Sequence, residues 1–188
     1  MRGTQSRLGS PSTYMRKIIL VLLSALLATT ATAQPPDAVV GTWRLVSFLS
    51  PDSTGQQRPV WGEHPTGLII YTSDGHVSAQ LYDPHRPRLG EIANATPFSG
   101  AQAQYGGLYT YFGTFSVDGT AHTVSHHVEG AMAPDWVGST LVRAYRFLGP
   151  DRLELRVMTD AAGRTVENGS ILVWERVRPG QAGPSSKE

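Results

Sequence analysis

Hydrophobic and polar positions alternate with a period of two along most of the chain after residue 38. This pattern is typical of strands with one buried and one exposed face. Turn sequences such as Asp118-Gly119 and Asn168-Gly169 separate several of these runs and predict antiparallel hairpins. Eight such strands can close into an up-and-down β-barrel without free edges. The predicted strands are 39–49, 68–72, 76–82, 111–117, 122–129, 139–148, 152–157 and 170–177.

Two segments depart from the strand pattern. Residues 97–109 carry an apolar stripe at helical spacing, with Thr96 as the N-cap and Pro97 in the first turn. They predict one short helix between the third and fourth strands, although Gly106-Gly107 weakens it. The tail over 178–188 is rich in Pro, Gly and Ser, which predicts disorder.

The N-terminal segment has the pattern of a secretory signal. Arg16 and Lys17 precede an apolar run over 18–28 that is too short to span a bilayer. Small residues at 31–33 (Ala-Thr-Ala) then supply a signal-peptidase site. Residues 1–33 are therefore predicted to direct export to the periplasm or the medium, which leaves no membrane span once they are removed.

Charge and composition bear on the rest of the chain. Residues 1–33 hold four of the 16 basic side chains and none of the 15 acidic ones, so the remainder has a formal charge of −3. That balance, without a Lys/Arg cluster, argues against nucleic acid as a partner. We expect one domain over 34–177, a monomer or a weak homo-oligomer. Residues 1–14, polar and without pattern, fit an over-extended gene start.

Several short motifs carry a family resemblance. In order along the chain they are GTWRLVS at 41–47, PTGLIIYTSDG at 65–75, SAQL at 78–81, SHHVEG at 125–130, DWVG at 135–138 and LVWER at 172–176. Together they resemble the lipocalin-like domain family of small bacterial and fungal proteins, from Val40 to Val177. The resemblance implies an all-β, eight-stranded antiparallel lipocalin-like barrel. It implies no general reaction and no set of catalytic residues, and the export signal departs from many relatives.

The resemblance also implies a role for Trp43. In lipocalin-type barrels the first-strand tryptophan lies across the narrow end, and an arginine from the last strand packs over its ring. Arg176 or Arg178 matches that arginine. We interpret the pair as a structural plug, stabilised by a cation–π contact. Trp174 is expected to pack rather than to bind.

The segment around His126 and His127 is the most suggestive chemically. Neighbouring strand residues face opposite ways, so only one of the two histidines can enter the barrel. Val124 and Val128 share the face of His126 and favour His126 as the inward residue. His122 and His126 lie roughly 13 Å apart at about 3.3 Å per residue, too far for one metal ion. We therefore expect neither a metal site nor a cofactor; no cysteine is available as a ligand either.

An inward histidine beside a tyrosine allows two interpretations. It can move protons on an enolisable or cyclising ligand, or it can simply hydrogen-bond a hydroxyl group across the lumen. The candidate acid/base residues are His126, His127, Tyr71, Tyr82 and Tyr145. The candidate ligand-binding residues are His126, Tyr71, His76, Gln80, Tyr82, Arg143 and Trp136.

Arg143 and Arg146 lie on opposite faces of one predicted strand, so one of them is expected to turn inward. A buried arginine needs an anionic partner. Glu129, Glu175 or a carboxylate on a ligand could provide it.

The sequence thus favours an exported barrel that binds a small apolar or amphipathic molecule in its lumen. One alternative is an enzyme of isomerase, cyclase or dehydratase type that uses a lumen histidine as acid/base. A second alternative is a barrel with a packed interior that acts as a protein-interaction scaffold. A lumen of a few hundred Å³ would favour the first two over the third.

The signal predicts where the mature chain begins. Cleavage after Ala33 should give an N-terminus at Gln34, because the small residues at 31–33 fit signal peptidase. N-terminal sequencing of the exported protein measures this directly. A soluble cytoplasmic protein that retains residues 18–28 would contradict the prediction.

Overall fold

The computed structural model describes residues 36–87 and 106–180. The predicted signal, residues 97–105 of the predicted helix and the tail from 181 lie outside the described residues. The strands are β1 (Gly41–Pro51), β2 (Gln57–Pro59), β3 (Thr66–Tyr71), β4 (His76–Tyr82), β5 (Leu108–Asp118), β6 (Thr123–Ala131), β7 (Thr140–Gly149), β8 (Arg152–Val157) and β9 (Ile171–Arg176).

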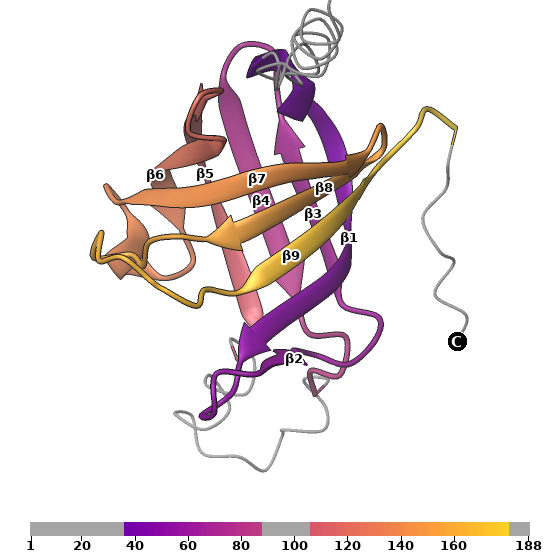
Figure 1. Cartoon of the computed structure of the whole chain (residues 1–188), viewed down its shortest axis with the longest axis vertical. Helices are drawn as coiled ribbons and strands as arrows, with labels where there is room; N and C mark the ends of the chain where they lie inside the picture. Colours follow the sequence, from indigo (N-terminus) through magenta and orange to yellow (C-terminus); the bar gives the residue numbers. More distant parts are fainter. Residues whose placement is uncertain (1–35, 88–105, 181–188) are drawn as a thin grey trace, which may run out of the picture. The chain divides into compact units, whose positions relative to one another are not determined.

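The strands form a closed antiparallel barrel. Each strand from β3 to β9 pairs with the next, and β1 pairs with both β3 and β9. β1 can do so because its first residues pair with β3, at Gly41–Tyr71, while the stretch from Trp43 to Leu49 pairs with β9. Figure 1 shows the outcome: β7, β8 and β9 cross in front of β3, β4 and β5 as opposite walls.

Eight strands close the barrel as the sequence predicts, and β2 is an addition. β2 pairs only with the last residues of β1, from Leu49 to Pro51, and lengthens that edge. The predicted helix is wrong at its C-terminal end, because Leu108 and Tyr109 belong to β5. In the described ranges the helical turns are 3₁₀: η2 (Pro36–Val39) and η4 (Pro134–Trp136), neither reaching seven residues. None of the helices described is long and apolar enough to cross a membrane.

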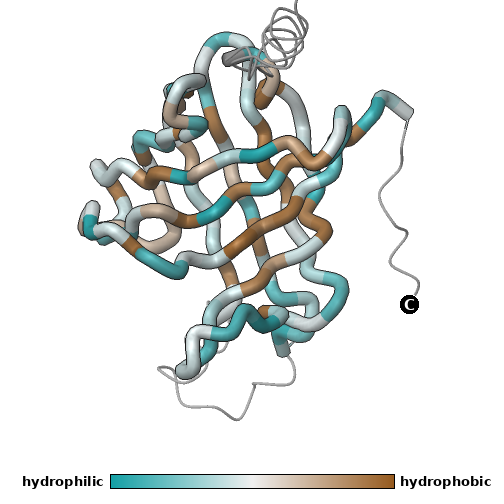
Figure 2. Tube along the Cα trace, in the orientation of Figure 1, coloured by the Kyte–Doolittle hydropathy of each residue, from teal (hydrophilic) through white to brown (hydrophobic). Residues whose placement is uncertain are grey.

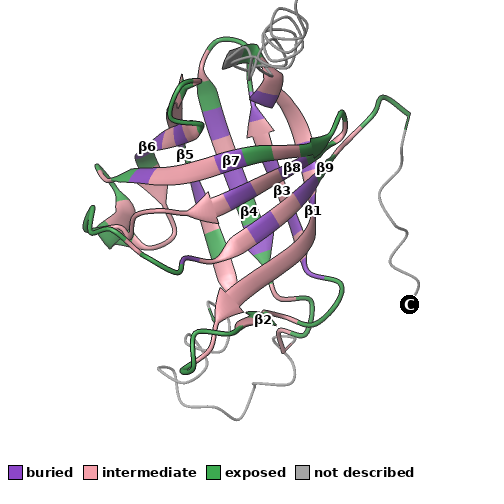
Figure 3. Cartoon of the chain, in the orientation of Figure 1, coloured by how far each residue is buried: buried purple, intermediate pink, exposed green. Residues whose placement is uncertain are grey.

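The interior follows from the period-two alternation. Along β4, for example, Val77, Ala79 and Leu81 are buried whereas His76, Gln80 and Tyr82 are exposed. Figure 2 shows the hydrophobic positions gathered in the strands, with hydrophilic residues in the loops around β2, and Figure 3 shows buried stretches recurring on every wall. One polar residue, His126, is buried in this otherwise hydrophobic core of the described residues.

Trp43 closes one end of the barrel, as the resemblance implies. Its side chain is fully buried, and its Nε1 donates to the carbonyl oxygen of Val39 at 2.8 Å. The Arg176 guanidinium lies 4.0 Å from the ring centroid and donates to the carbonyl oxygens of Val40 and Ala38. Gly41 is required beside them, because a Cβ there would meet Arg176 Nη1 at 2.5 Å and its φ is +137°.

Gly113 permits one of the irregularities in the wall. The register between β5 and β6 shifts between Phe112 and Gly113, and a Cβ at Gly113 would overlap the carbonyl oxygen of His127. Such a bulge bends its strand and increases the local twist. It lies between Tyr111 and the β6 histidines, so it helps to set how those side chains meet.

Removal of the Trp43 side chain should be costly. Trp43→Ala is expected to lower the free energy of unfolding by about 3–5 kcal/mol, because it leaves a cavity in a filled end of the core. Arg176→Met should cost less, about 1–2 kcal/mol, through loss of the cation–π contact and its hydrogen bonds. Urea denaturation measures both. Phe112→Ala is the matched control: Phe112 is 57% exposed on the outer face, so its loss should cost no more than about 0.5 kcal/mol.

Candidate ligand site

A cavity of about 660 Å³ occupies the barrel, and Trp43 is not among the residues that line it. Its inner wall is largely aliphatic and is formed by six residues from five strands: Ile69, Ala79, Leu81, Leu141, Leu155 and Leu172. This volume is of the size that holds a small organic molecule. The lumen is therefore not packed solid, unlike the interior expected of a scaffold.

Aromatic residues gather at the edge of this cavity, where Phe48, Tyr109 and Trp136 line it and Trp61 packs against two of them. Tyr109 of β5 stacks between Trp61 and Trp136, with ring centroids 5.6 and 6.0 Å apart. Phe48 packs edge-on against Trp61 at 5.1 Å. Trp61 itself has a φ of 64°, a left-handed conformation that costs a bulky residue energy and persists only where its surroundings hold it. The rings on either side hold Trp61 in place here. We call Phe48, Trp61, Tyr109 and Trp136 the aromatic rim.

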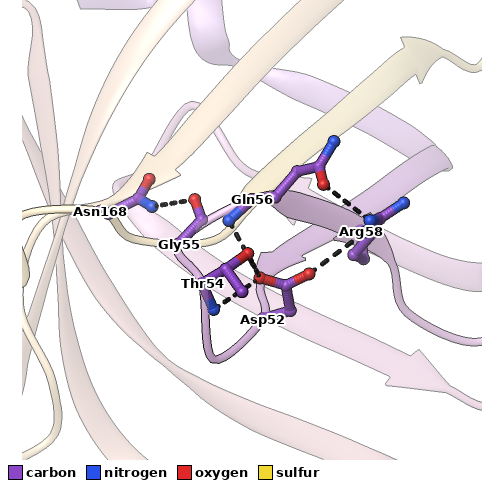
Figure 4. Close-up of polar contacts among 6 residues, drawn as sticks. All are labelled: Asp52, Thr54, Gly55, Gln56, Arg58 and Asn168. Atoms are coloured by element: carbon purple, nitrogen blue, oxygen red, sulfur yellow. Dashed lines mark hydrogen bonds and ion pairs between the residues drawn. The ribbon is translucent and has the colours of Figure 1, made fainter.

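A polar cluster holds two loops together at the same end of the barrel (Figure 4). The Asp52 carboxylate accepts hydrogen bonds from the Thr54 and Gln56 backbone N–H groups and from Arg58 Nε. These bonds, with the Thr54 hydroxyl group as the largest contributor, lower the pKa of Asp52 to about 2. Asn168, from the loop before β9, donates to the carbonyl oxygen of Gly55 at 2.7 Å. The β1–β2 turn is thus tied to the β8–β9 loop.

The floor of the cavity holds a buried Tyr–His–Tyr chain. The Tyr71 hydroxyl group lies 2.7 Å from His126 Nε2, and the Tyr111 hydroxyl group lies 2.8 Å from His126 Nδ1. β3, β5 and β6 supply one residue each, and all three residues are buried. Of the three, His126 and Tyr111 line the cavity.

Burial sets the charge state of this chain. It lowers the pKa of His126 well below 6.5, and the nearby Arg143 and His127 lower it further. Burial also raises the pKa of Tyr71 well above 10.0 and raises that of Tyr111. At neutral pH all three groups are therefore uncharged.

The hydrogen bonds and the cavity together assign a direction to the chain. A neutral imidazole has one donor and one acceptor nitrogen, so one tyrosine donates to His126 and the other accepts from it. Neither tyrosine has another partner among the described residues, and we assign the Tyr71 proton to His126 Nε2 because Tyr111 lines the cavity whereas Tyr71 does not. His126 Nδ1–H then donates to the Tyr111 oxygen. The hydroxyl proton of Tyr111 remains, next to the cavity that Tyr111 lines.

Arg143 is the inward arginine of β7. It lies between the buried Leu141 and Tyr145 on the inner face and lines the cavity, whereas Arg146 is exposed and pairs with Glu154 at 2.9 Å. Arg143 Nη1 donates to the carbonyl oxygens of Val142 and Thr159 at 3.0 and 3.4 Å. No carboxylate of the described ranges forms an ion pair with Arg143. Neither Glu129 nor Glu175 is therefore its partner.

The structure brings four of the predicted ligand-binding residues together. His126, Arg143 and Trp136 line the cavity. Tyr71 does not line it but is hydrogen-bonded to His126. His126 is the inward member of the histidine pair, in the orientation expected from Val124 and Val128.

Four other candidates, His76, Gln80, Tyr82 and Tyr145, lie elsewhere, which corrects the expectation that they line the lumen, whereas His127 is exposed as expected of the outward histidine. His76, Gln80 and Tyr82 are exposed on the outside of β4, because the apolar residues between them fill the interior. His127 is exposed and contacts the Ser116 and Thr140 hydroxyl groups. Tyr145 is buried but packs against His122 and Phe147 rather than lining the cavity.

The sequence predicted Trp136 of the aromatic rim but not Tyr111 or the other three rim residues. Tyr111 begins a predicted strand on the face that continues with Gly113 and Phe115, and that alternation was the available signal. The position of Trp61 in the aromatic rim depends on its left-handed backbone conformation, which no local sequence pattern predicts. Trp174, expected only to pack, also lines the cavity.

Comparison with known proteins places this barrel in a family. The family model described as a lipocalin-like domain matches residues 40–177. The chain belongs to the lipocalin-like domain family. The lipocalin-like barrel fold is consistent with binding a small ligand. For the described residues, no group of three or more His, Asp or Glu side chains is placed to hold a metal ion in this lipocalin-like domain.

Other comparisons give only distant likenesses for this lipocalin-like protein. No curated protein matches it. Among solved structures it is similar to a redesigned β-barrel, at 11% identity and a TM-score of 0.38, over 76% of this chain and 94% of that one. It is also similar to a de novo designed fluorescence-activating β-barrel, at 12% identity and a TM-score of 0.39, over 77% of this chain and all of that one.

The buried histidine predicts a pH dependence of stability. Below about pH 6.5 the unfolded chain binds a proton at His126 that the folded barrel does not, because burial lowers the folded-state pKa. The free energy of unfolding should therefore fall as the pH drops from 7 to 5, with a slope that approaches about 1.4 kcal/mol per pH unit from this group. Urea denaturation across that range measures the slope. His126→Phe should remove this part of it, and the outward His127→Phe should not. Equal slopes in the two variants would contradict the assignment.

Proposed function

We propose that this protein binds a small, mainly apolar molecule in the lumen of its barrel and does so after export. The single observation that carries the proposal is the cavity of about 660 Å³ with an aliphatic inner wall. Burial of a ligand against such a wall contributes about 25 cal/mol per Å² of apolar surface, so an apolar body is favoured. The leader pattern over 1–33 supports export.

The aromatic rim supports the same function. Tyr109, 41% exposed, and Trp136 line the cavity at its rim and present flat apolar faces beside the aliphatic interior. Aromatic faces bury large areas with little loss of side-chain freedom. The tie between Asn168 and Gly55 holds the loops near this rim in one arrangement. A preformed site loses less ordering entropy when it binds its ligand.

An enzyme that uses the same cavity is the second candidate, and the buried Tyr–His–Tyr chain is the observation that favours it. The geometry changes which residue would act. Both ring nitrogens of His126 already have tyrosine partners, so His126 cannot contact a substrate with a free nitrogen. Tyr111 would face the substrate, and its raised pKa makes it a hydrogen-bond donor to a developing oxyanion rather than a base.

A neutral hydrophobic dye tests lumen binding. N-phenyl-1-naphthylamine should bind the wild-type protein with enhanced fluorescence, because the cavity excludes water from the dye. Ala79→Phe should weaken that binding at least about tenfold, since Ala79 lines the cavity and a phenyl ring there would occupy its space. Fluorescence titration gives both dissociation constants.

Gln80→Phe is the matched control. It adds the same ring on the same strand but on the exposed face, so dye affinity should stay within about twofold of wild type. Circular dichroism melts establish that both variants are folded. Dye binding that Ala79→Phe leaves unchanged would place the dye outside the lumen and contradict the proposal.

A further inference from the structure

Two of the polar residues that line the cavity from its strands are donors. Tyr111 presents its remaining hydroxyl proton, and Arg143 presents a guanidinium group. His126 adds no acceptor, because both of its ring nitrogens are engaged by tyrosines. Ser50 and Ser170 also line the cavity, but their hydroxyl groups bond each other at 3.0 Å.

Arg143 has unused donor capacity at this wall. Nη1 bonds two carbonyl oxygens, while Nε and Nη2 have no acceptor among the described residues. This part-buried guanidinium group pairs favourably with an anion, and its planar fork matches the two oxygens of a carboxylate.

None of the described carboxylates that line the cavity forms an ion pair with Arg143. Asp135 and Asp160 line the cavity only from the connecting segments beyond β6 and β8. Asp160 is paired with Arg164 at 2.7 Å, and its carboxylate accepts hydrogen bonds from the backbone N–H groups of Ala162 and Arg164. Asp135 is exposed in η4 and forms no ion pair with a described residue.

We propose that the ligand is an apolar carboxylate whose head group pairs with Arg143 and accepts a hydrogen bond from Tyr111, while its body lies against the aliphatic wall. This inference rests on the proposed function and names its ligand class. A ligand with an alcohol or ester head group has no negative charge to pair with Arg143. A ligand with an amine head group presents hydrogen-bond donors to the donors of Tyr111 and Arg143. Ligands of these three classes should therefore bind more weakly than a carboxylate.

Displacement of N-phenyl-1-naphthylamine by a matched pair of ligands tests the proposal at pH 7.5. Decanoic acid, ionised at that pH, should bind the wild-type protein at least about tenfold more tightly than methyl decanoate, as expected for a hydrogen-bonded charge pair. Arg143→Met should reduce this preference to within about twofold while dye binding persists. Arg143→Lys should restore part of it. Tyr111→Phe should weaken the acid about threefold to tenfold.

Arg146→Met is the control for charge alone. It removes an arginine from the same strand, but from the outer face, and should leave the preference intact. Equal affinity of the wild-type protein for acid and ester would overturn the carboxylate proposal while lumen binding of the dye still stood. A preference that survives in Arg143→Met would also overturn it. Failure of the dye and both decanoyl compounds to bind would instead remove the proposed function, and this inference with it.

Discussion

The pairing of β1 with two partners is the constraint on which the rest of the structure depends. One end of β1 pairs with β3 and its middle pairs with β9, so that the sheet closes on itself. Closure satisfies the backbone groups that open edge strands would leave unpaired. It also creates an inner face that every strand must share. Trp43 at one end of that face, capped by Arg176, fills the end of the barrel where β1 meets both neighbours.

The interior that closure creates is unusual in containing His126. Burial of an imidazole in an apolar core is costly unless both ring nitrogens are satisfied. Tyr71 and Tyr111 satisfy them at 2.7 and 2.8 Å, and the neutral state of the ring makes that pairing possible with one donor and one acceptor. A consequence follows for the cavity: one hydroxyl proton, that of Tyr111, has no partner within the chain of three. The Tyr111 hydroxyl group, which is needed as a hydrogen-bond partner of the buried His126, thus also presents a donor to the lumen.

The sequence was sufficient for the fold because the period-two alternation and the hairpin turns specify both strands and faces. The same alternation predicted that His126 points inward and that Arg143 and Arg146 oppose one another. Along β4 the alternation places Val77, Ala79 and Leu81 on the inner face, so the prediction that Gln80 and Tyr82 line the lumen is wrong. β2 could not be predicted, since its three residues form a strand only through the end of β1. The meeting of Tyr71, Tyr111 and His126 could not be predicted either, because it depends on the stagger between strands and on the bulge at Gly113.

Unlike charges on the described cavity wall give a bound molecule a direction. Arg143 and Tyr111, on strands, offer a positive charge and a hydrogen-bond donor, whereas Asp135, in η4, offers a negative charge. Asp160 also lines the cavity, but Arg164 lines it too and pairs with Asp160 at 2.7 Å, so this pair brings no net charge. An anionic head group is therefore disfavoured at Asp135 and favoured at Arg143. A molecule with one anionic and one apolar end has its lowest energy with the head group at Arg143, because any other placement would leave Arg143 without a counter-charge.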